Sequence, residues 1–497
     1  MSWHDKAAAL KPDGRAVIDG QRVAASNGET FDKHSPIDGR LLGPVARGRS
    51  ADIDAAVRSA RAAFEDGRWA GKPPAVRKRL LQRFAEKILA AKDELALLET
   101  LDMGKPIQHA LGVDVPSAAR CIQWYAEAVD KIYDEIAPTG PNALALITRE
   151  PVGVVGVIVP WNYPMIMASW KLGPALAAGN SVVLKPSEKS PYTALRLAEL
   201  ALEAGIPQGV FNVVPGYGAE AGEALALHMD VDALGFTGST RTGRRMLDYA
   251  SRSNLKRVYN ELGGKSAFIV FDDFANVARA AKTVAGAMFF NQGESCNAPS
   301  RVLVHERIAD EFVAIVAAQA PRYAPGDPLD PATVMGAVVD ETQMNTVLGY
   351  IEAGRNEGAR IVTGGSRARS DSGGYYVEPT VFDGVANSMA IAREEIFGPV
   401  LSVIRFKSEA EAIQLANASP YGLQASVWSH DINRAHRVAR ALRAGTVHVN
   451  QYDEDDITVP FGGVKQSGNG RDKSLHAFDK YTELKTTWLR IDPAPAE

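Results

Sequence analysis

Apolar residues recur with a helical period in some stretches of this chain and cluster in short runs in others. Short apolar runs separated by Asp-Gly turns occupy residues 15–47 and predict small strands. Apolar spacing of three and four residues then predicts three amphipathic helices, at about 52–66, 74–93 and 117–135. Two further stretches, 143–149 and 481–490, resemble isolated strands outside any strand–helix unit, and we expect them to pair with a neighbouring subunit at a sheet edge.

From residue 152 onwards, short and strongly apolar strands alternate with helical segments. The predicted strands are 152–159, 181–185, 210–214, 233–236 and 257–260, and the predicted helices are about 164–178, 190–204, 219–228 and 241–252. A second alternating region, about 266–450, contains helices near 275–290, 308–320 and 342–356 and strands near 301–305, 400–405, 424–429 and 445–449. Strands that are apolar throughout are buried on both faces, so the alternation predicts an α/β fold with parallel sheets covered by helices.

Length and composition limit the possibilities further. A chain of 497 residues is too long for one core, so we expect two or three domains. The formal net charge of −4 gives no reason to expect a nucleic-acid partner. The two cysteines are far apart and form no disulfide framework, which fits a reducing cytoplasm. The N-terminus lacks the pattern of a signal peptide, and Gly, Pro and Asn interrupt the longest apolar run, 151–170, so we expect no membrane span.

One of the two cysteines lies in a stretch suited to chemistry. A helical apolar run ends near Phe290, a turn rich in Gly, Ser and Asn carries Cys296, and an apolar strand begins near Val302. A thiol on a polar turn between two buried elements is a candidate nucleophile if its surroundings favour the thiolate. The alternative is a small buried apolar residue, the usual role of a free cysteine, and this is our interpretation of Cys121, inside a helical stretch.

Several predicted strands end in residues suited to a nucleotide, and ligands of open parallel sheets bind beyond such ends. After strand 233–236, a Gly/Ser/Thr turn leads into a helix, where backbone N–H groups favour a phosphate. Arg244 and Arg245 stand where a nucleoside-triphosphate loop requires Lys-Ser/Thr, and the strict glycine pattern of dinucleotide folds is also absent. Glu188, three residues after Lys185, could bind ribose hydroxyls and repel a 2′-phosphate, which favours NAD over NADP. The alternatives are a plain helix cap and an exposed Lys/Glu pair.

Further side chains would complete a site for acyl chemistry. Glu261 ends a strand before two glycines and could be a general base if burial raises its pKa. Asn162 could donate its amide to an oxyanion, and Glu395 lies in a turn that is uninformative by itself. Ordinary turn positions are the alternative for each. Together with Cys296, these residues supply a nucleophile, a base and an oxyanion donor beside a dinucleotide site. We identify no metal site.

Seven motifs in this order resemble the NAD(P)-dependent aldehyde dehydrogenase superfamily over essentially the whole chain. They are Pro160-Trp161-Asn162, Lys185-Pro186-Ser187-Glu188, Phe236-Thr237-Gly238-Ser239, Glu261-Leu262-Gly263-Gly264-Lys265, the run from Asn291 to Cys296, Glu395-Ile396-Phe397-Gly398-Pro399 and Pro460-Phe461-Gly462-Gly463. The resemblance implies a Rossmann-like, parallel-sheet NAD-binding domain (1–133 and 152–263), an α/β catalytic domain (264–465) and a small β oligomerisation arm (134–151 and 478–497). It also implies a homo-oligomer, a dimer or a tetramer, joined through 143–149 and 481–490.

The resemblance implies a role for each site residue. Cys296 would attack the aldehyde to form a thiohemiacetal, Asn162 and the Cys296 backbone N–H would hold the oxyanion, and Glu261 would activate the water that hydrolyses the later thioester. Lys185, also grouped with the catalytic residues, and Glu188 would bind the adenine ribose, Ser239 the pyrophosphate, and Glu395 with Phe397 the nicotinamide end. The other cofactor residues implied are Ile158, Val159, Pro160, Trp161, Ser187, Gly218, Phe236, Leu262 and Gln343. One departure is Asn260, because an apolar residue is usual just before the base.

Two stretches, 3–20 and 465–485, are similar to the aminoaldehyde branch of this family, which includes the γ-glutamyl-γ-aminobutyraldehyde and 4-guanidinobutyraldehyde dehydrogenases of polyamine and arginine breakdown. An aromatic wall with an acid would suit an ammonium or guanidinium group. The residues proposed for this wall are Asp114, Tyr163, Trp170 and Tyr452, with core packing as the alternative for Trp170. The acidic run Asp453, Glu454, Asp455 and Asp456 could attract a cationic aldehyde, although a solvated turn is the stronger interpretation.

The sequence thus predicts the NAD-dependent oxidation of an amino- or guanidino-substituted aliphatic aldehyde to its carboxylate, with NADP as the less favoured cofactor. The alternatives are a general aliphatic or betaine-type aldehyde dehydrogenase, a CoA-acylating relative and a non-catalytic protein that keeps the fold. Glu261 argues for water, not a thiol, as the acyl acceptor.

Overall fold

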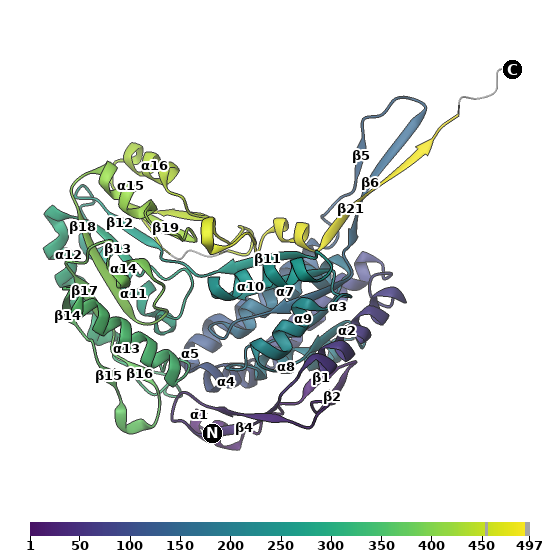
Figure 1. Ribbon diagram of the computed structural model, residues 1–497, viewed down its shortest axis with the longest axis horizontal. Helices are drawn as coiled ribbons and strands as arrows, with labels where there is room; N and C mark the ends of the chain where they lie inside the picture. Colours follow the sequence, from purple (N-terminus) through teal and green to yellow (C-terminus); the bar gives the residue numbers. More distant parts are fainter. Residues whose placement is uncertain (453–455, 493–497) are drawn as a thin grey trace.

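The computed structural model describes residues 1–452 and 456–492, in which two seven-stranded sheets and a three-stranded arm organise the chain (Figure 1). Helices cover both large sheets, and the arm projects from the body. Of the predicted acidic run, Asp453, Glu454 and Asp455 lie outside the described residues and only Asp456 lies within them.

The first large sheet has the strand order β11-β10-β7-β8-β9-β1-β2. Its parallel strands are β7 (Val154–Ile158), β8 (Ser181–Lys185), β9 (Phe211–Val213), β10 (Ala233–Gly238) and β11 (Arg257–Leu262); β1 (Ala16–Ile18) and β2 (Gln21–Val23) extend one edge antiparallel. One apolar cluster joins one face to α2 (Ser50–Glu65), α9 (Glu223–Leu227) and α10 (Thr240–Arg252). A second cluster joins the other face to α3 (Pro74–Ala90), α6 (Val115–Ala128), α7 (Pro164–Ala178) and α8 (Tyr192–Glu203). The predicted parallel sheet with two covered faces is confirmed.

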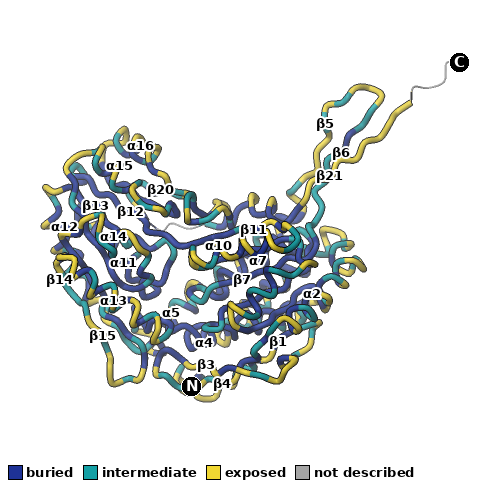
Figure 2. Tube along the Cα trace, in the orientation of Figure 1, coloured by how far each residue is buried: buried dark blue, intermediate teal, exposed yellow. Residues whose placement is uncertain are grey.

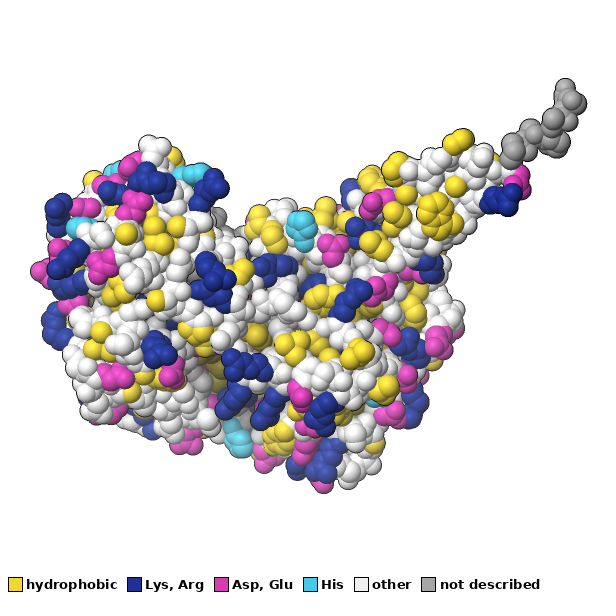
Figure 3. Space-filling model, turned by 45° about the horizontal axis from the view of Figure 1, so that its top comes forward, with side chains coloured by type: hydrophobic (Ala, Val, Ile, Leu, Met, Phe, Trp, Pro, Cys, Tyr) yellow, Lys and Arg dark blue, Asp and Glu magenta, His cyan; other side chains and the backbone are white. Residues whose placement is uncertain are grey.

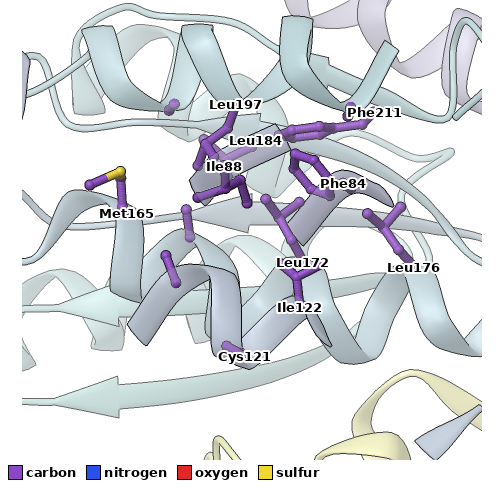
Figure 4. Close-up of a cluster of buried hydrophobic side chains, with 14 of the residues drawn as sticks. Phe84, Ile88, Cys121, Ile122, Met165, Leu172, Leu176, Leu184, Leu197 and Phe211 are labelled. Carbon is purple, nitrogen blue, oxygen red and sulfur yellow. The ribbon is translucent and has the colours of Figure 1, made fainter. Parts of the chain in front are cut away.

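The cluster beneath α3, α6 and α7 accounts for the second cysteine (Figure 4). Cys121 of α6 lies in this layer with Ile122, Phe84 and Leu172, and it is 1% exposed. Its thiol donates to the carbonyl oxygen of Ser169 at 3.3 Å, and burial raises the pKa of the thiol to about 12. Cys121 is therefore a buried apolar residue, as its helical context predicts.

The helical region before the first sheet differs from prediction in two places. α4 (Lys92–Met103) is a separate helix that the apolar pattern does not reveal. All its residues from Leu95 to Met103 are buried, and a helix buried all round has no polar face to set a period. The predicted helix 117–135 instead ends at Ala128, and β5 (Glu135–Ala137) follows.

The second large sheet has the order β14-β17-β18-β13-β12-β19-β20. Its strands are β12 (Ala267–Val270), β13 (Arg301–His305), β17 (Thr380–Asp383), β18 (Val400–Phe406), β19 (Gln424–Trp428) and β20 (Thr446–Val449), all parallel, with β14 (Arg360–Thr363) antiparallel at one edge. α11 (Val277–Phe289) and α12 (Glu306–Gln319) cover one face, and α13 (Glu341–Asn356), α15 (Glu409–Asn417) and α16 (Ile432–Ala441) the other. The predicted segments of this region are present, while β12, β14, β17, α15 and α16 are additions.

The arm consists of β21 (Thr482–Arg490), β6 (Ala143–Pro151) and β5. The two stretches expected to be isolated strands pair with each other, in antiparallel register from Thr482 opposite Pro151 to Arg490 opposite Ala143. The prediction that each is an isolated strand was therefore wrong, because local sequence does not reveal a partner strand more than 300 residues away. The arm remains largely exposed (Figure 2), and hydrophobic side chains lie on its surface (Figure 3). Leu484 and Trp488 of β21 are among the exposed apolar residues. Subunit pairing through it stays a prediction.

Smaller elements complete the described chain. They are α1 (Trp3–Ala9), β3 (Thr30–His34), β4 (Leu41–Ala46), α5 (Ile107–His109), β15 (Arg367–Ala368), β16 (Tyr376–Val377) and α14 (Ala390–Arg393). The strands of each sheet all come from a single one of the three predicted domains. We therefore propose that the chain divides into an NAD-binding unit (1–133 and 152–263), a catalytic unit (264–465) and an arm (134–151 and 478–497). Within 1–452 and 456–492, no helix is both long and apolar enough to span a bilayer.

Candidate active site

Cys296 lies on a loop that folds against both large sheets, and we call residues 290–297 the nucleophile loop. It begins with three consecutive residues in the left-handed region, Asn291 (φ 48°), Gln292 (φ 58°) and Gly293 (φ 71°). A Cβ on Gly293 would lie 2.3 Å from the carbonyl oxygen of Gly398, so only glycine fits there. The side chain of Glu294 accepts from the Val339 N–H at 3.0 Å. These contacts hold the half-buried thiol in a defined place.

Two cavities meet at Cys296. One, of about 650 Å³, runs between α6, α7 and α11 and is lined largely by aromatic and apolar side chains. The other, of about 840 Å³, lies over the ends of β7, β10 and β11 and is lined by Asn162, Glu261 and Glu395 among others. Ligand cavities have volumes of about 300–1,000 Å³, so each could hold a small molecule. Their meeting point allows a thiol to face a substrate on one side and a cofactor on the other.

Asn162 follows β7 and is fastened to the nucleophile loop. Its side-chain amide donates to the carbonyl oxygen of Glu294 at 2.9 Å, and the amide of Asn291 donates to the Asn162 carbonyl oxygen at 3.0 Å. An amide nitrogen carries two N–H groups, so the second can meet an oxyanion formed at Cys296. The structure thus brings this predicted donor to the same cavity as the thiol.

Glu261 occupies the end of β11 and is 1% exposed. Its carboxylate lies within hydrogen-bonding reach of the Cys296 thiol. Burial raises the pKa of Glu261 to about 8; Lys171 opposes the rise, and Asp472 and Glu395 add to it. A carboxyl in this state can accept a proton near neutral pH. The unusual Asn260 faces elsewhere, with its amide donating to the Gly243 carbonyl oxygen at 3.1 Å.

The residues predicted to bind the adenosine end of the cofactor lie along the strand ends of the first sheet. Ile158, Lys185 and Phe236 share this edge, because Ile158 is in register with both of the others. Lys185 and Glu188 form an ion pair at 3.0 Å. Burial alone would raise the pKa of Glu188, but Lys185 holds it below its ordinary value. Glu188 is therefore an anion whose side chain is 34% exposed, as a ribose acceptor must be.

The predicted nicotinamide end lies next to the thiol. Glu395 accepts from the Gly264 N–H at 3.0 Å, and burial raises its pKa to about 7. A Cβ on Gly263 would lie only 2.0 Å from this carboxylate, so glycine leaves room for the Glu395 side chain in this position. Phe397 has a left-handed φ of 58° and meets the Trp161 ring edge-on at 5.2 Å. The amide of Gln343 donates to the Phe397 carbonyl oxygen at 2.7 Å and so supports this loop.

The hydrogen-bond donors and acceptors at these positions fit a dinucleotide. Ser239 caps α10, where backbone N–H groups favour phosphate, and two carboxylates, Glu188 and Glu395, can accept from ribose hydroxyls on either side of it. Predicted cofactor residues that line the 840 Å³ cavity are Pro160, Trp161, Ser239, Leu262, Gln343, Glu395 and Phe397. The others lie outside its lining: Ile158, Val159, Lys185, Ser187, Glu188, Gly218 and Phe236.

The 650 Å³ cavity has an aromatic wall. Tyr163 shares a 2.6 Å hydrogen bond with Ser295, beside the nucleophile. The Trp170 ring lies 5.0 Å from that of Phe461, and the hydroxyl of Tyr452 donates to the Asn297 carbonyl oxygen. These three predicted substrate residues therefore line one cavity.

Asp114 does not belong to this wall, and its prediction as a lining residue is corrected. A turn of π-helix at Ala110–Asp114 directs the carboxylate inward, where it pairs with Lys105 at 2.6 Å. Lys105 lies 4.4 Å from the centre of the Tyr163 ring, so the pair supports the wall from behind. Sequence reasoning also missed Lys473, which does line the cavity, and the buried ions Lys171, Asp472 and Lys480; no local pattern marks them.

Comparison with known proteins agrees with this geometry. Residues 23–487 match the aldehyde dehydrogenase family. The chain is 54% identical over 490 residues to the NADP/NAD-dependent aldehyde dehydrogenase PuuC of Escherichia coli, covering 99% of this chain and 98% of that one. It is similar to the crystal structure of γ-glutamyl-γ-aminobutyraldehyde dehydrogenase from Burkholderia cenocepacia, with 58% identity, a TM-score of 0.97 and coverage of 99% and 100%. It is also similar to the P. syringae indole-3-acetaldehyde dehydrogenase in complex with NAD⁺, with 59% identity, a TM-score of 0.98 and the same coverage.

The match over residues 23–487 includes the nucleophile loop and every residue that lines the two cavities. The resemblance drawn from seven motifs is confirmed, as is the predicted fold, and the non-catalytic alternative is excluded by the agreement of family, fold and site. The chain belongs to the aldehyde dehydrogenase family and is an NAD(P)-dependent oxidoreductase that acts on aldehydes.

Proposed function

We propose that the protein oxidises an amino- or guanidino-substituted aliphatic aldehyde with NAD⁺ and water, giving the carboxylate, NADH and two protons. The observation that carries this proposal is the position of Cys296 where an aromatic cavity meets a second cavity that contains the buried carboxyl of Glu261. That arrangement separates the aldehyde from the cofactor and places a base on the side from which water must attack.

Cys296 and Asn162 act in the first half of the reaction. The thiolate attacks the aldehyde carbon, a C–S bond forms, and the carbonyl oxygen becomes an oxyanion. The amide of Asn162, held by Glu294, donates to that oxygen together with the Cys296 backbone N–H. Bound NAD⁺ supplies the hydride acceptor that turns the thiohemiacetal into a thioester.

The second half belongs to Glu261. Its ionised carboxylate takes a proton from water, and the resulting hydroxide attacks the thioester carbon. The C–S bond then breaks, the thiolate leaves, and the carboxylic acid product loses its proton to give the carboxylate. With a pKa of about 8, about one-tenth of Glu261 is ionised at pH 7 and about nine-tenths at pH 9. The rate of hydrolysis should therefore rise with pH across this range. The buried base also supports water over CoA as the acyl acceptor.

Glu188 supports NAD⁺ as the preferred cofactor. It is an anion beside the predicted adenine ribose, and its charge would repel a 2′-phosphate. The name of the PuuC relative includes both cofactors, so acceptance of NADP⁺ at lower efficiency is compatible with this proposal.

Tyr452 of the aromatic wall supports a cationic substrate, because ring faces attract ammonium and guanidinium groups. The rings of Tyr163 and Trp170 already lie against Lys105 and Lys473, at 4.4 and 5.4 Å from the ring centres, so they support it less. The Burkholderia relative is named for an aldehyde derived from an amine. An aromatic wall also suits an uncharged aromatic aldehyde, and the P. syringae relative is named for indole-3-acetaldehyde. General aliphatic and betaine-type aldehydes remain alternatives. Asp456 gives little support to steering by the acidic run, since its carboxylate pairs with Arg120 at 2.9 Å.

The arm supports assembly into a dimer or tetramer. Its outer strand β21 has an unpaired edge and exposes Leu484, Trp488 and Leu489, which a second subunit could cover. A cytoplasmic location is part of the same proposal, because the nucleophile must stay reduced and neither cysteine forms a disulfide within the described residues.

A substrate panel tests the proposal. The kcat/KM values with NAD⁺ would be compared for 4-guanidinobutanal, 4-aminobutanal, γ-glutamyl-aminobutanal, betaine aldehyde, indole-3-acetaldehyde and propanal. We expect the amine-derived aldehydes to lead by at least about tenfold. Equal values for propanal or a lead for indole-3-acetaldehyde would overturn the substrate assignment. Cys296→Ala should abolish NADH formation, and Glu261→Gln should accumulate acyl-enzyme after one burst of NADH; absence of that intermediate would overturn the base assignment.

A further inference from the structure

Three buried ions lie behind Glu261. Asp472 binds two ammonium groups, with Lys171 on Oδ2 and Lys480 on Oδ1, the latter at 2.5 Å. All three side chains are 6% exposed or less. They come from three separate segments: α7, the loop before the 3₁₀ helix Leu475–Lys480, and the end of that helix.

The cluster lies directly under the strand ends that carry the base. Lys171 donates to the hydroxyl of Thr237 at 2.8 Å, and Thr237 is in register with Glu261 across β10 and β11. A Cβ placed on Gly235 of β10 would be 3.4 Å from both Lys171 Cδ and the Tyr481 hydroxyl. The side chains of α7 and of the C-terminal segment therefore pack together beneath this strand.

The net charge of this cluster affects how readily Glu261 ionises. Two lysines and one aspartate have a net charge of +1, in a place from which water is largely excluded. When Glu261 is ionised, the set of four becomes neutral; without Lys480, the same set would be −1. Because an uncompensated charge is strongly disfavoured in a dry interior, the second lysine favours ionisation of the base.

We propose that Lys480 is the counter-charge of the general base: it acts through Glu261, without touching the substrate, and allows the base to ionise near neutral pH. This inference rests on the proposed function of Glu261. The titratable groups that influence Glu261 are Lys171 of α7, Asp472, Glu395 of the nicotinamide loop and the Cys296 thiol, and Glu261 in turn raises the pKa of Lys480.

The directions of the pKa shifts of Glu261, Asp472 and Lys480 agree with this proposal. After burial, Lys171 is the largest influence on the pKa of Glu261 and lowers it, whereas Asp472 raises it. Burial alone would raise the pKa of Asp472, but Lys171 and Lys480 together hold it below its ordinary value. Burial lowers the pKa of Lys480, while Asp472 and Glu261 both raise it, so the lysine and the base favour each other's charged forms.

The test uses the full-length enzyme and the pH dependence of acyl-enzyme hydrolysis, followed after a single burst of NADH. In Lys480→Met, the acidic limb of this profile should move to higher pH by about one unit, so that hydrolysis at pH 7 slows about tenfold and recovers at high pH. Lys480→Arg keeps the charge and should restore the wild-type limb. Asp472→Asn removes the opposing charge and should move the limb to lower pH.

A structural effect gives a different result. If Lys480→Met lowers hydrolysis equally at every pH, or leaves the limb in place, the inference is overturned. If that variant does not fold, Asp472→Asn still decides: a limb that stays in place or moves to higher pH overturns the inference. Failure of the proposed function is distinguished by Glu261→Gln, which should accumulate acyl-enzyme; if it does so and the two charge variants leave the limb unmoved, only the role of Lys480 is wrong.

Discussion

Replacing Glu261 by Gln should make the protein more stable at alkaline pH, in addition to removing the base. The carboxyl of Glu261 is buried, and burial disfavours its ionised form in the folded state. Gln has the same shape and no charge. Gln resembles the protonated carboxyl and cannot ionise, so the substitution removes the pH-dependent penalty of ionising the buried group.

The magnitude follows from the pKa. Burial raises the pKa of Glu261 from 4.5 to about 8. A carboxyl that binds its proton more tightly when folded contributes stability that is complete below pH 4.5 and is lost as pH rises to about 8. Between pH 6 and pH 9 the loss covers about two pH units, which is about 3 kcal/mol at about 1.4 kcal/mol per unit. For a domain of about 200 residues this corresponds to roughly 5–10 °C in Tm.

The assay is thermal unfolding of both proteins at pH 6, 7, 8 and 9 in matched buffers. The Tm of Glu261→Gln minus that of the wild type should grow by roughly 5–10 °C from pH 6 to pH 9. Glu188→Gln is the control, because Lys185 holds the pKa of Glu188 below its ordinary value and its contribution is constant above pH 6. Parallel Tm profiles for wild type and Glu261→Gln would refute the reasoning that burial sets the state of the base.

Three other predictions concern the cofactor and the arm. Gly263→Ala places a Cβ 2.0 Å from the Glu395 carboxylate, so the side chain must move, and the Kd for NAD⁺ measured by fluorescence titration should rise about tenfold; an unchanged Kd would contradict the role of Glu395. Glu188→Ala should raise the ratio of kcat/KM with NADP⁺ to that with NAD⁺ by about tenfold in steady-state assays, and an unchanged ratio would separate this carboxylate from cofactor choice. Replacing Leu484 and Trp488, which are 61% and 67% exposed on the arm, by Ser should reduce the particle mass in light scattering; an unchanged mass would place the subunit contact elsewhere.

Local apolar patterns predicted many of the helices and strands. The strands that became β7, β8, β13 and β19 were predicted within about three residues at either end, because strands buried on both faces are apolar along their whole length. α4 was missed for the related reason that a helix buried all round has no amphipathic period. The pairing of β6 with β21 was also missed, since no local signal links strands so far apart in sequence.

The site divides in the same way. The sequence by itself determined the chemical groups and their order: a thiol on a polar turn, a carboxyl at a strand end, an amide and the nucleotide-binding turns, together with the family they resemble. Only the tertiary structure decided their environment. It turned Asp114 inward to Lys105, brought Lys480 and Asp472 beneath Glu261 and removed the base from water. The physical reason is that a side chain's type is a local property, whereas its pKa depends on burial and on charges that the fold brings together from distant segments.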